Sequence, residues 1–380
     1  MIYLDNAATS FPKPPEVQAA TRRALEQAWG NPGRAGHGSS LQAGRIVQRT
    51  REKLARLFGS EDPEQVIFTA NATQAINQVL FGLLKSDDHV ITTSIEHNAV
   101  TRPLAALSRR GVKVTEIPVP LEGQVDVERF AKSFTPSTRL LVTTHASNVT
   151  GTLLPVRDLG ALAAAHGVLY LVDAAQTAGV FDLDMTRDQI SFLTFPGHKG
   201  LLGPQGTGGL LIRGEVLLDP LIYGGTGSVS EKDEQPDYYP DRLESGTLNT
   251  IGIAGLDAAL TYLEAKTLKE IRSREQALCQ RLIDGLLTIP GVRVYGGTNA
   301  SEKAPIVAFN LRDLDSLQVA FILDNSFGIQ TRAGLHCAPH AHRTLGTLEQ
   351  GVVRLSPSHF TREEDIDTTL DVIRQIALEL

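Results

Sequence analysis

Short apolar runs alternate with longer amphipathic stretches through the first half of the sequence, and this alternation limits the possible folds more than any other feature. The runs are rich in β-branched residues, which is typical of strands, and they cover residues 66–68, 90–92, 112–117, 140–144 and 169–172. The stretches between them carry apolar residues at helical spacing, over residues 72–84, 98–109, 126–133 and 156–166. This order predicts an α/β fold with a mostly parallel sheet flanked by helices.

The second half of the sequence changes character. Residues 191–195 and 208–212 are expected to extend the same sheet, and residues 250–287 have helical spacing, with a linker-like change near Gly252–Gly255. Beyond Gly291, short strands and helices mix, with strands expected at 292–295, 306–310 and 352–355 and helices at 314–325 and 362–378. We therefore predict a large domain over residues 15–254 and a small α+β domain from residues 1–14 and 255–380.

Composition excludes several functional classes. The formal net charge of −7 gives no general attraction to nucleic acid. No stretch approaches the ~20 apolar residues needed to cross a bilayer, and the first residues lack the basic start and apolar run of an export signal. Cys279 and Cys337, the two cysteines, are far apart in the sequence and do not suggest a disulfide framework. We expect a cytoplasmic protein that binds neither nucleic acid nor membranes.

Lys199 is the first candidate for chemistry. It lies between an apolar strand and a glycine-dense loop, in the segment Phe195-Pro-Gly-His-Lys-Gly-Leu-Leu-Gly-Pro-Gln-Gly. Glycines allow the backbone to approach a flat ligand closely. A lysine forms a Schiff base only as the neutral amine, and partial burial lowers its pKa from about 10.4 toward that state. The alternative is a solvated surface lysine.

Asp173 strengthens the first interpretation. It ends the apolar run Tyr170-Leu-Val-Asp, and Gln176 follows it. Ligands of open α/β sheets bind beyond the carboxyl ends of the strands. An aspartate there can keep the pyridine nitrogen of pyridoxal 5'-phosphate (PLP) protonated, which makes the ring an electron sink, and Gln176 can bond the ring hydroxyl. Asp173 as a helix N-cap is an equal alternative.

Two further segments point to the same edge of the sheet. Ala72 and Thr73 begin a helix directly after a strand, and free N–H groups at a helix N-terminus suit a phosphate. Thr73 as a plain helix cap is the alternative. His97 follows the next strand, where its imidazole can lie against a pyridine ring; a histidine that only packs is the alternative.

Five motifs, taken in order along the chain, resemble those of the class V aminotransferase group of PLP-dependent enzymes, and within it the cysteine desulfurases and selenocysteine lyases. The resemblance extends from Tyr3-Leu-Asp-Asn-Ala-Ala-Thr to Val353-Arg-Leu-Ser. Its most specific parts are Ser147-Asn-Val-Thr-Gly, Val172-Asp-Ala-Ala-Gln, Gly197-His-Lys, Glu244-Ser-Gly-Thr-Leu-Asn-Thr and Arg332-Ala-Gly-Leu-His-Cys-Ala. The resemblance implies an aspartate aminotransferase-like fold, with a mostly parallel seven-stranded sheet and a small α+β C-terminal domain.

The resemblance also implies roles for individual residues. Lys199 would bind PLP covalently, with the ring and phosphate held by Ala72, Thr73, His97, Asp173, Gln176 and His198. Thr247 would reach the phosphate in the neighbouring subunit of a homodimer. Asn148, Arg332 and Arg354 would bind the substrate, an arginine because its planar fork matches a carboxylate.

Cys337 separates a desulfurase from a plain aminotransferase. The resemblance places it where desulfurases carry the cysteine that attacks the sulfur of bound L-cysteine and passes it on, often to an acceptor protein. A free thiol is only slightly ionised at pH 7, so it needs a positive neighbour; His336, Arg332 and the bound cofactor are the candidates. An inert buried cysteine is the alternative, and it suits Cys279 better.

Two positions depart from the family pattern. Pro196 stands where these enzymes usually place a Ser or Thr that binds phosphate, and proline has neither a hydroxyl nor an N–H. We therefore expect one phosphate contact to be missing or replaced. Leu335 replaces a polar residue beside the reactive loop.

Two rival functions are also compatible with the sequence. One is another PLP enzyme, such as a selenocysteine lyase, transaminase or epimerase, in which Cys337 is incidental. The other is a metal-binding protein that uses His336, Cys337, His340 and His342. The spacing of these four residues fits no usual zinc pattern, and we expect no metal.

Overall fold

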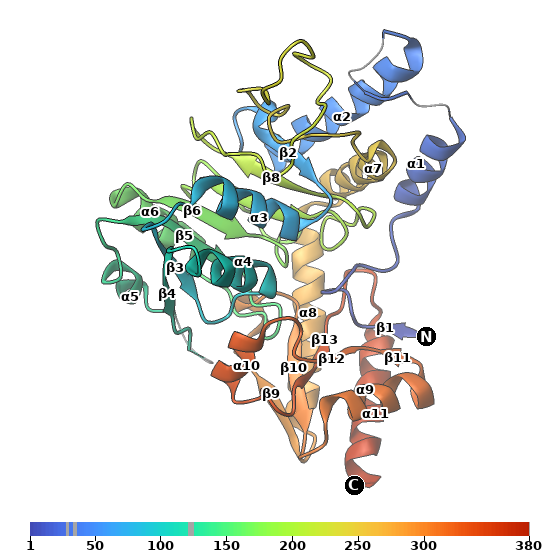
Figure 1. Cartoon of the computed structure of the whole chain (residues 1–380). Helices are drawn as coiled ribbons and strands as arrows, with labels where there is room; N and C mark the ends of the chain where they lie inside the picture. The colour runs from blue at the N-terminus through green and yellow to red at the C-terminus, as the bar shows by residue number, and fades with distance from the viewer. Residues whose placement is uncertain (28–29, 33–35, 121–124, 380) are drawn as a thin grey trace.

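The protein is described here from a computed structural model that covers residues 1–27, 30–32, 36–120 and 125–379 (Figure 1). A seven-stranded sheet forms the centre of its larger part, in the order β2-β8-β7-β6-β5-β3-β4. The strands are β2 (Val66–Thr69), β3 (His89–Thr93), β4 (Lys113–Ile117), β5 (Thr138–Thr144), β6 (Leu169–Asp173), β7 (Phe192–Pro196) and β8 (Gly208–Ile212). Only β8 runs antiparallel to its neighbours, so the predicted mostly parallel sheet is confirmed.

Both faces of this sheet are covered by helices, which explains why its central strands are apolar on both sides, whereas the edge strand β4 is largely exposed. Val90 and Leu140 face one apolar cluster, which includes side chains of α3 (Ala72–Leu83) and α4 (Asn98–Ser108). Ile91 and Leu141 face the other, which includes side chains of α2, α5, α6 and α7. These helices are α2 (Gly38–Leu57), α5 (Val127–Ala131), α6 (Val156–Ala165) and α7 (Thr250–Lys266).

The expected linker near Gly252–Gly255 is wrong, because both glycines lie inside α7. A Cβ on Gly255 would stand 2.4 Å from Pro204 Cγ, so the glycine serves close packing. The predicted helical stretch 250–287 is in fact two helices, α7 and α8 (Leu268–Leu287), separated by Thr267 at a φ of 63°. Helices α1 (Pro15–Glu26) and α2 were not predicted.

A second sheet lies in the lower part of Figure 1, beside the long helix α8. Its strand order is β12-β13-β10-β9, all antiparallel. The elements are β9 (Val292–Tyr295), β10 (Val307–Leu311), α9 (Ser316–Phe327), β12 (Arg332–Gly334), α10 (Pro339–Leu345), β13 (Val352–Leu355) and α11 (Glu363–Glu379). Five of these elements, β9, β10, α9, β13 and α11, match the strands and helices expected for this region within a few residues. Strand β12 and helix α10 were not predicted.

The N-terminus lies against this second part. Strand β1 (Ile2–Tyr3) pairs in parallel with β11 (Ile329–Gln330), and Leu4 belongs to an apolar cluster whose other buried members lie between Leu278 and Ala377. A small domain that includes the N-terminus would need this packing. The predicted domain boundaries, between residues 14 and 15 and between residues 254 and 255, stay a prediction. Within the described residues, no helix is long and apolar enough to span a membrane.

Candidate active site

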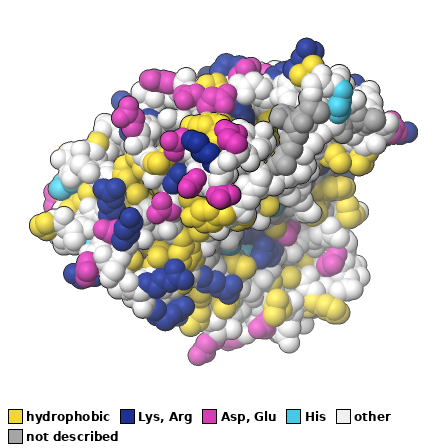
Figure 2. All heavy atoms as spheres, turned by 45° about the horizontal axis from the view of Figure 1, so that its top comes forward, with side chains coloured by type: hydrophobic (Ala, Val, Ile, Leu, Met, Phe, Trp, Pro, Cys, Tyr) yellow, Lys and Arg dark blue, Asp and Glu magenta, His cyan; other side chains and the backbone are white. Residues whose placement is uncertain are grey.

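The carboxyl ends of the parallel strands meet at one edge of the large sheet, as expected for a ligand site. A cavity of about 190 Å³ opens there, and Figure 2 shows one hollowed face of the molecule with basic and histidine side chains visible inside the hollow. Eight residues proposed from the sequence line this cavity: Ala72, Thr73, His97, Asn148, Asp173, Gln176, His198 and Lys199. Pro196 and Thr144 line it too.

Lys199 enters the cavity from the turn that follows β7. Its pKa falls to about 8, first because the amine is buried and second because Arg354 lies nearby, while Asp173 acts in the opposite direction. About a tenth of this amine is therefore neutral at pH 7, far more than for a solvated lysine. This is the state that can attack a carbonyl carbon.

Asp173 ends β6 with its side chain almost fully buried. Its Oδ1 accepts a hydrogen bond from the Ala175 N–H at 2.9 Å, in a turn rather than in a helix, so the helix-cap alternative is wrong. Burial raises its pKa, and the bond from Ala175 and the charge of Lys199 counteract that rise. Gln176 donates from Nε2 to the Ala7 carbonyl at 3.2 Å.

The start of α3 lines the cavity through Asn71, Ala72 and Thr73. Asn71 caps this helix by accepting from the Gln74 N–H at 2.9 Å, so the alternative of Thr73 as the cap is wrong. Thr73 is exposed, and its side chain stays available to a ligand. His198 Nδ1 is buried with no hydrogen-bond partner among the described residues, which points to a group that the protein itself does not supply.

His97 is held at the start of α4. Its Nδ1 accepts from the Ala99 N–H at 3.0 Å, which leaves the proton of the neutral ring on Nε2. Burial, followed by the charges of Lys199 and Arg332, lowers the pKa of His97 to about 4. The imidazole is therefore uncharged at neutral pH. A neutral ring is suited to lie against another aromatic ring.

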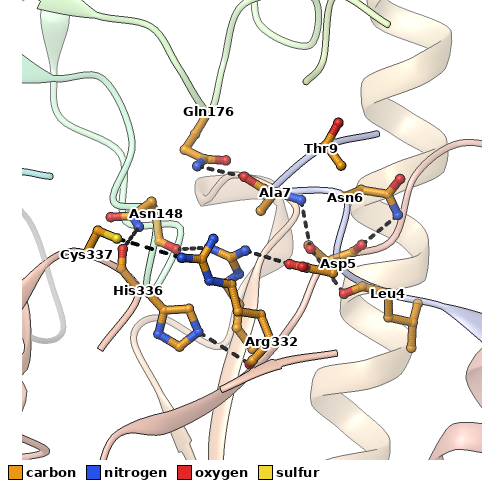
Figure 3. A network of polar contacts seen from close by, with 12 residues as sticks. Leu4, Asp5, Asn6, Ala7, Thr9, Asn148, Gln176, Arg332, His336 and Cys337 are labelled. Carbon is orange, nitrogen blue, oxygen red and sulfur yellow. Dashed lines mark hydrogen bonds and ion pairs between the residues drawn. The ribbon is translucent and has the colours of Figure 1, made fainter. Parts of the chain in front are cut away.

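A second group of residues lies around the antiparallel pair of β12 and β13 (Figure 3). Asn148 connects this group to the cavity, because its Nδ2 donates to the His336 carbonyl at 2.7 Å and its carbonyl accepts from Arg354 Nη1 at 2.9 Å. Arg332 Nη2 lies 3.8 Å from Cys337 Sγ. Arg332, Cys337 and Arg354 do not line the cavity itself.

Cys337 is exposed on the loop between β12 and α10, whereas Cys279 is buried in α8. His336 and Cys337 both have positive φ, 51° and 56°, an unusual conformation for residues other than glycine that turns this loop sharply. Burial lowers the pKa of His336 to about 2. His336 is therefore neutral and cannot supply the positive charge that a thiolate needs, which leaves Arg332 as the nearest cation.

Thr247 lies outside the cavity of its own chain. It is exposed and its Oγ1 accepts a hydrogen bond from Asn31 at 3.3 Å. It lines a separate pocket of about 210 Å³ beside β2 and β8. A contact from Thr247 to a phosphate would therefore have to be made in another subunit.

The metal-binding alternative has no support in the described part of the chain, where no group of three or more His, Cys, Asp and Glu side chains is placed to hold a metal ion. His340 Nδ1 lies 2.5 Å from Glu116 Oε2. The ring of His342 is parallel to that of His336, with centroids 5.8 Å apart, and Cys337 contacts Arg332 instead.

Sequence reasoning missed two acidic residues near the site. Glu96 is fully buried, burial raises its pKa to about 8, and its carboxyl group accepts from the Thr144 N–H at 3.0 and 2.9 Å. Asp5 pairs with Arg354 at 2.8 Å. Asp5 lies in a motif that carried the family resemblance, but no role was assigned to it; the position of Glu96, just before His97, was the only signal for Glu96.

Comparison with known proteins agrees with this geometry. The model of the aminotransferase class-V family matches residues 2–369. A probable cysteine desulfurase of Methanothermobacter thermautotrophicus is 35% identical over 99% of this chain and 94% of its own length, and a cysteine desulfurase of Salmonella agona is 32% identical over 97% and 91%. The apo structure of a cysteine desulfurase from Thermococcus onnurineus superposes with a TM-score of 0.94 at 33% identity, covering 100% of this chain and 95% of the other. The chain therefore belongs to the aminotransferase class-V family of enzymes, with cysteine desulfurases as its relatives.

Proposed function

We propose that this chain is a PLP-dependent cysteine desulfurase, which converts L-cysteine to L-alanine and takes the sulfur onto Cys337. The main observation is that Asn148 connects two reactive groups, since it lines the cavity of Lys199 and bonds to the His336 carbonyl next to Cys337. On one side is the buried Lys199 amine with a pKa lowered to about 8. On the other is the exposed Cys337 thiol beside Arg332.

The cavity fits a phosphorylated pyridine aldehyde in its charges and donors. The N–H groups at the start of α3 with Thr73 suit the phosphate, and the unpartnered His198 Nδ1 lies in the same wall. Asp173 suits a protonated ring nitrogen, and His97 suits a place against the ring. When bound, the cofactor stabilises the negative charge that develops on the α-carbon of the substrate.

The substrate carboxylate is assigned to Arg354, with Asn148 and Arg332 nearby. Arg354 Nε and Asn148 Oδ1 are both buried without a hydrogen-bond partner in the described part of the protein. A guanidinium N–H suits a carboxylate, and an amide oxygen suits an ammonium or amine group. An L-amino acid supplies both.

The chain's own groups then move one proton and one sulfur atom. With the substrate bound, Lys199 Nζ would take the α-proton. Cys337 Sγ, which lies 3.8 Å from Arg332 Nη2, would lose its proton and form a bond to the substrate sulfur, while the bond between that sulfur and the β-carbon breaks and its electron pair stays with the β-carbon. The sulfur remains on Cys337 as a persulfide, and the three-carbon product leaves as alanine after it gains protons.

The exposure of Cys337 supports a further part of the proposal, that a sulfur-acceptor protein collects the sulfur there. The position of Thr247 outside its own cavity supports a homodimer in which Thr247 serves the phosphate of the partner subunit. Two free cysteines support a cytoplasmic location.

The test is an assay of alanine released from L-cysteine by the purified protein with bound PLP. We expect release by the native chain, and none by Cys337→Ala, which should still carry the visible absorbance of the cofactor. Cys279→Ala is the matched control and should remain active. Alanine release by Cys337→Ala at the native rate would show that Cys337 is incidental, as in the rival PLP enzymes.

A further inference from the structure

The buried guanidinium of Arg354 already has a carboxylate partner within the chain. Only 1% of the Arg354 side chain is exposed, and its Nη2 donates to Asp5 Oδ1 at 2.8 Å. Nη1 donates to the Asn148 carbonyl, and Nε has no partner in the described ranges. The guanidinium proposed to bind the substrate carboxylate is thus partly used before any substrate arrives.

The backbone fixes Asp5 in this position. Asp5 forms an isolated parallel β-bridge with Ser356. The next two residues are held to Ser356 as well, because Asn6 Nδ2 donates to its carbonyl and the Ala7 N–H donates to its Oγ, both at 2.9 Å. Figure 3 shows this N-terminal segment beside the hairpin residues. The pairing with Arg354 is therefore built into the fold and does not depend on a mobile side chain alone.

Asp5 has two opposite effects: it stabilises the buried charge of Arg354, and it repels a ligand carboxylate that binds there. Arg332 is a second cation nearby, and Asp5 is the carboxylate that counteracts the effect of burial on the pKa of Arg354. A buried arginine without an anion is costly, so Asp5 stabilises Arg354 in the empty site. A second carboxylate on the same guanidinium, however, faces the negative charge of Asp5 at short range and is repelled.

We propose that Asp5 is a positioning residue that holds Arg354 in place for the substrate and, by repulsion, weakens the binding of amino-acid carboxylates so that the product leaves. This inference rests on the proposed function, because it takes Arg354 as the carboxylate site. Asp5 then determines affinity for the carboxylate end of the ligand and not for its amine end.

The experiment separates these two ends with two small probes. Propionate has the carboxylate of alanine but no amine, and ethylamine has the amine but no carboxylate. Both are titrated into the cofactor-loaded protein by calorimetry. Asp5→Asn keeps an oxygen acceptor for Nη2 but removes the charge, so we expect it to bind propionate about tenfold more tightly and ethylamine within a factor of two of the native protein.

Three further variants complete the test. Asp371→Asn, which removes the charge of an exposed pair with Arg374, is the matched control and should leave both probes unchanged. Asp5→Ala removes the acceptor as well; it should gain less propionate affinity than Asp5→Asn and melt at a lower temperature. Arg354→Gln should weaken the binding of propionate.

Two outcomes overturn the inference in different ways. If Arg354→Gln weakens propionate but Asp5→Asn binds it no more tightly than the native protein, the role of Asp5 is wrong and the proposed carboxylate site stands. If Arg354→Gln leaves propionate binding unchanged, the carboxylate site itself is wrong, and the role of Asp5 is wrong with it. If both KM for L-cysteine and kcat fall in Asp5→Asn, this supports slower product release in the variant.

Discussion

The residues around Lys199 and those around Cys337 are held by the fold in different ways. Lys199, Asp173 and His97 lie at or just after the carboxyl ends of β7, β6 and β3, in a sheet that is covered on both faces. Cys337 lies on an exposed loop between β12 and α10, where His336 and Cys337 both have positive φ. The first region changes the pKa of its groups mainly by burial, whereas the second places a thiol beside the charge of Arg332.

This difference matches two different tasks. A cofactor that stays bound needs a dry and rigid pocket, since desolvation is what makes the Lys199 amine reactive. A sulfur atom that must leave for another protein needs an accessible carrier. The comparison predicts that changes in the first region remove the cofactor itself, while changes in the second leave it bound.

Lys199→Ala gives the largest expected effect. Without the amine that binds the cofactor covalently, alanine release should fall by about 10³-fold or more, and the visible absorbance should be lost on gel filtration. Absorbance spectra of the native and variant proteins after loading with PLP check this. A variant that keeps the native spectrum would show that the cofactor is attached elsewhere and would break the comparison.

The pH dependence of cofactor loading tests the effect of burial on Lys199. Its pKa is lowered to about 8, so below that pH the fraction of neutral amine falls about tenfold for each unit. The loading rate of the apoprotein should therefore rise from pH 6 to pH 8 and then level off. A solvated lysine would give a rate that rises until about pH 10.4, and stopped-flow absorbance distinguishes the two curves.

Substitution of Pro196, in the same region, should have a smaller effect, on the affinity for PLP. Pro196 ends β7 and lines the cavity, but its side chain cannot donate a hydrogen bond. Pro196→Thr supplies a hydroxyl, and one added bond to a phosphate, worth about 1 kcal/mol, should tighten PLP binding about fivefold. Pro196→Ala is the control because it lacks the hydroxyl; equal affinity of the two variants would contradict a phosphate contact at this position.

The smallest effect is expected for Cys279→Ala, which tests whether the buried Cys279 differs in role from the exposed Cys337. Burial raises the pKa of Cys279 to about 12, so it remains a thiol. Cys279→Ala should lower the free energy of unfolding by about 1–2 kcal/mol through the cavity it leaves, with no loss of alanine release. Urea denaturation checks the first value, and an activity loss beyond that of partial unfolding would show that Cys279 takes part in the chemistry.

The sequence predicted the large sheet well because most of its strands are buried on both faces and appear as continuous apolar runs; the edge strand β4 is the exception. Helix α2 was missed because several of its buried residues are polar. Arg51 pairs with Glu244, and Lys53 lies 2.9 Å from Asp257. Such pairs join positions far apart in the sequence, so nothing local marks either partner as buried.

The residues of the site divide in a similar way. Lys199 and Asp173 were found because each follows a strand, and a strand end in an α/β sheet is a defined place. Asp5 was missed because its role depends on contact with Arg354, which no local pattern reveals. The neutral state of His336 could also not be foreseen, since it results from burial that only the folded chain shows.

Asp5 and Arg354 are 349 positions apart in the chain. Since a ribosome makes proteins from the N-terminus, Asp5 is finished long before its arginine exists, whereas all seven strands of the large sheet are complete by residue 212. Translation therefore supplies every strand of the pocket around Lys199 first and the anchor for the amino acid's acid group nearly last. A chain that stops short of β13 would contain Lys199 and every strand of the large sheet but would have no such anchor.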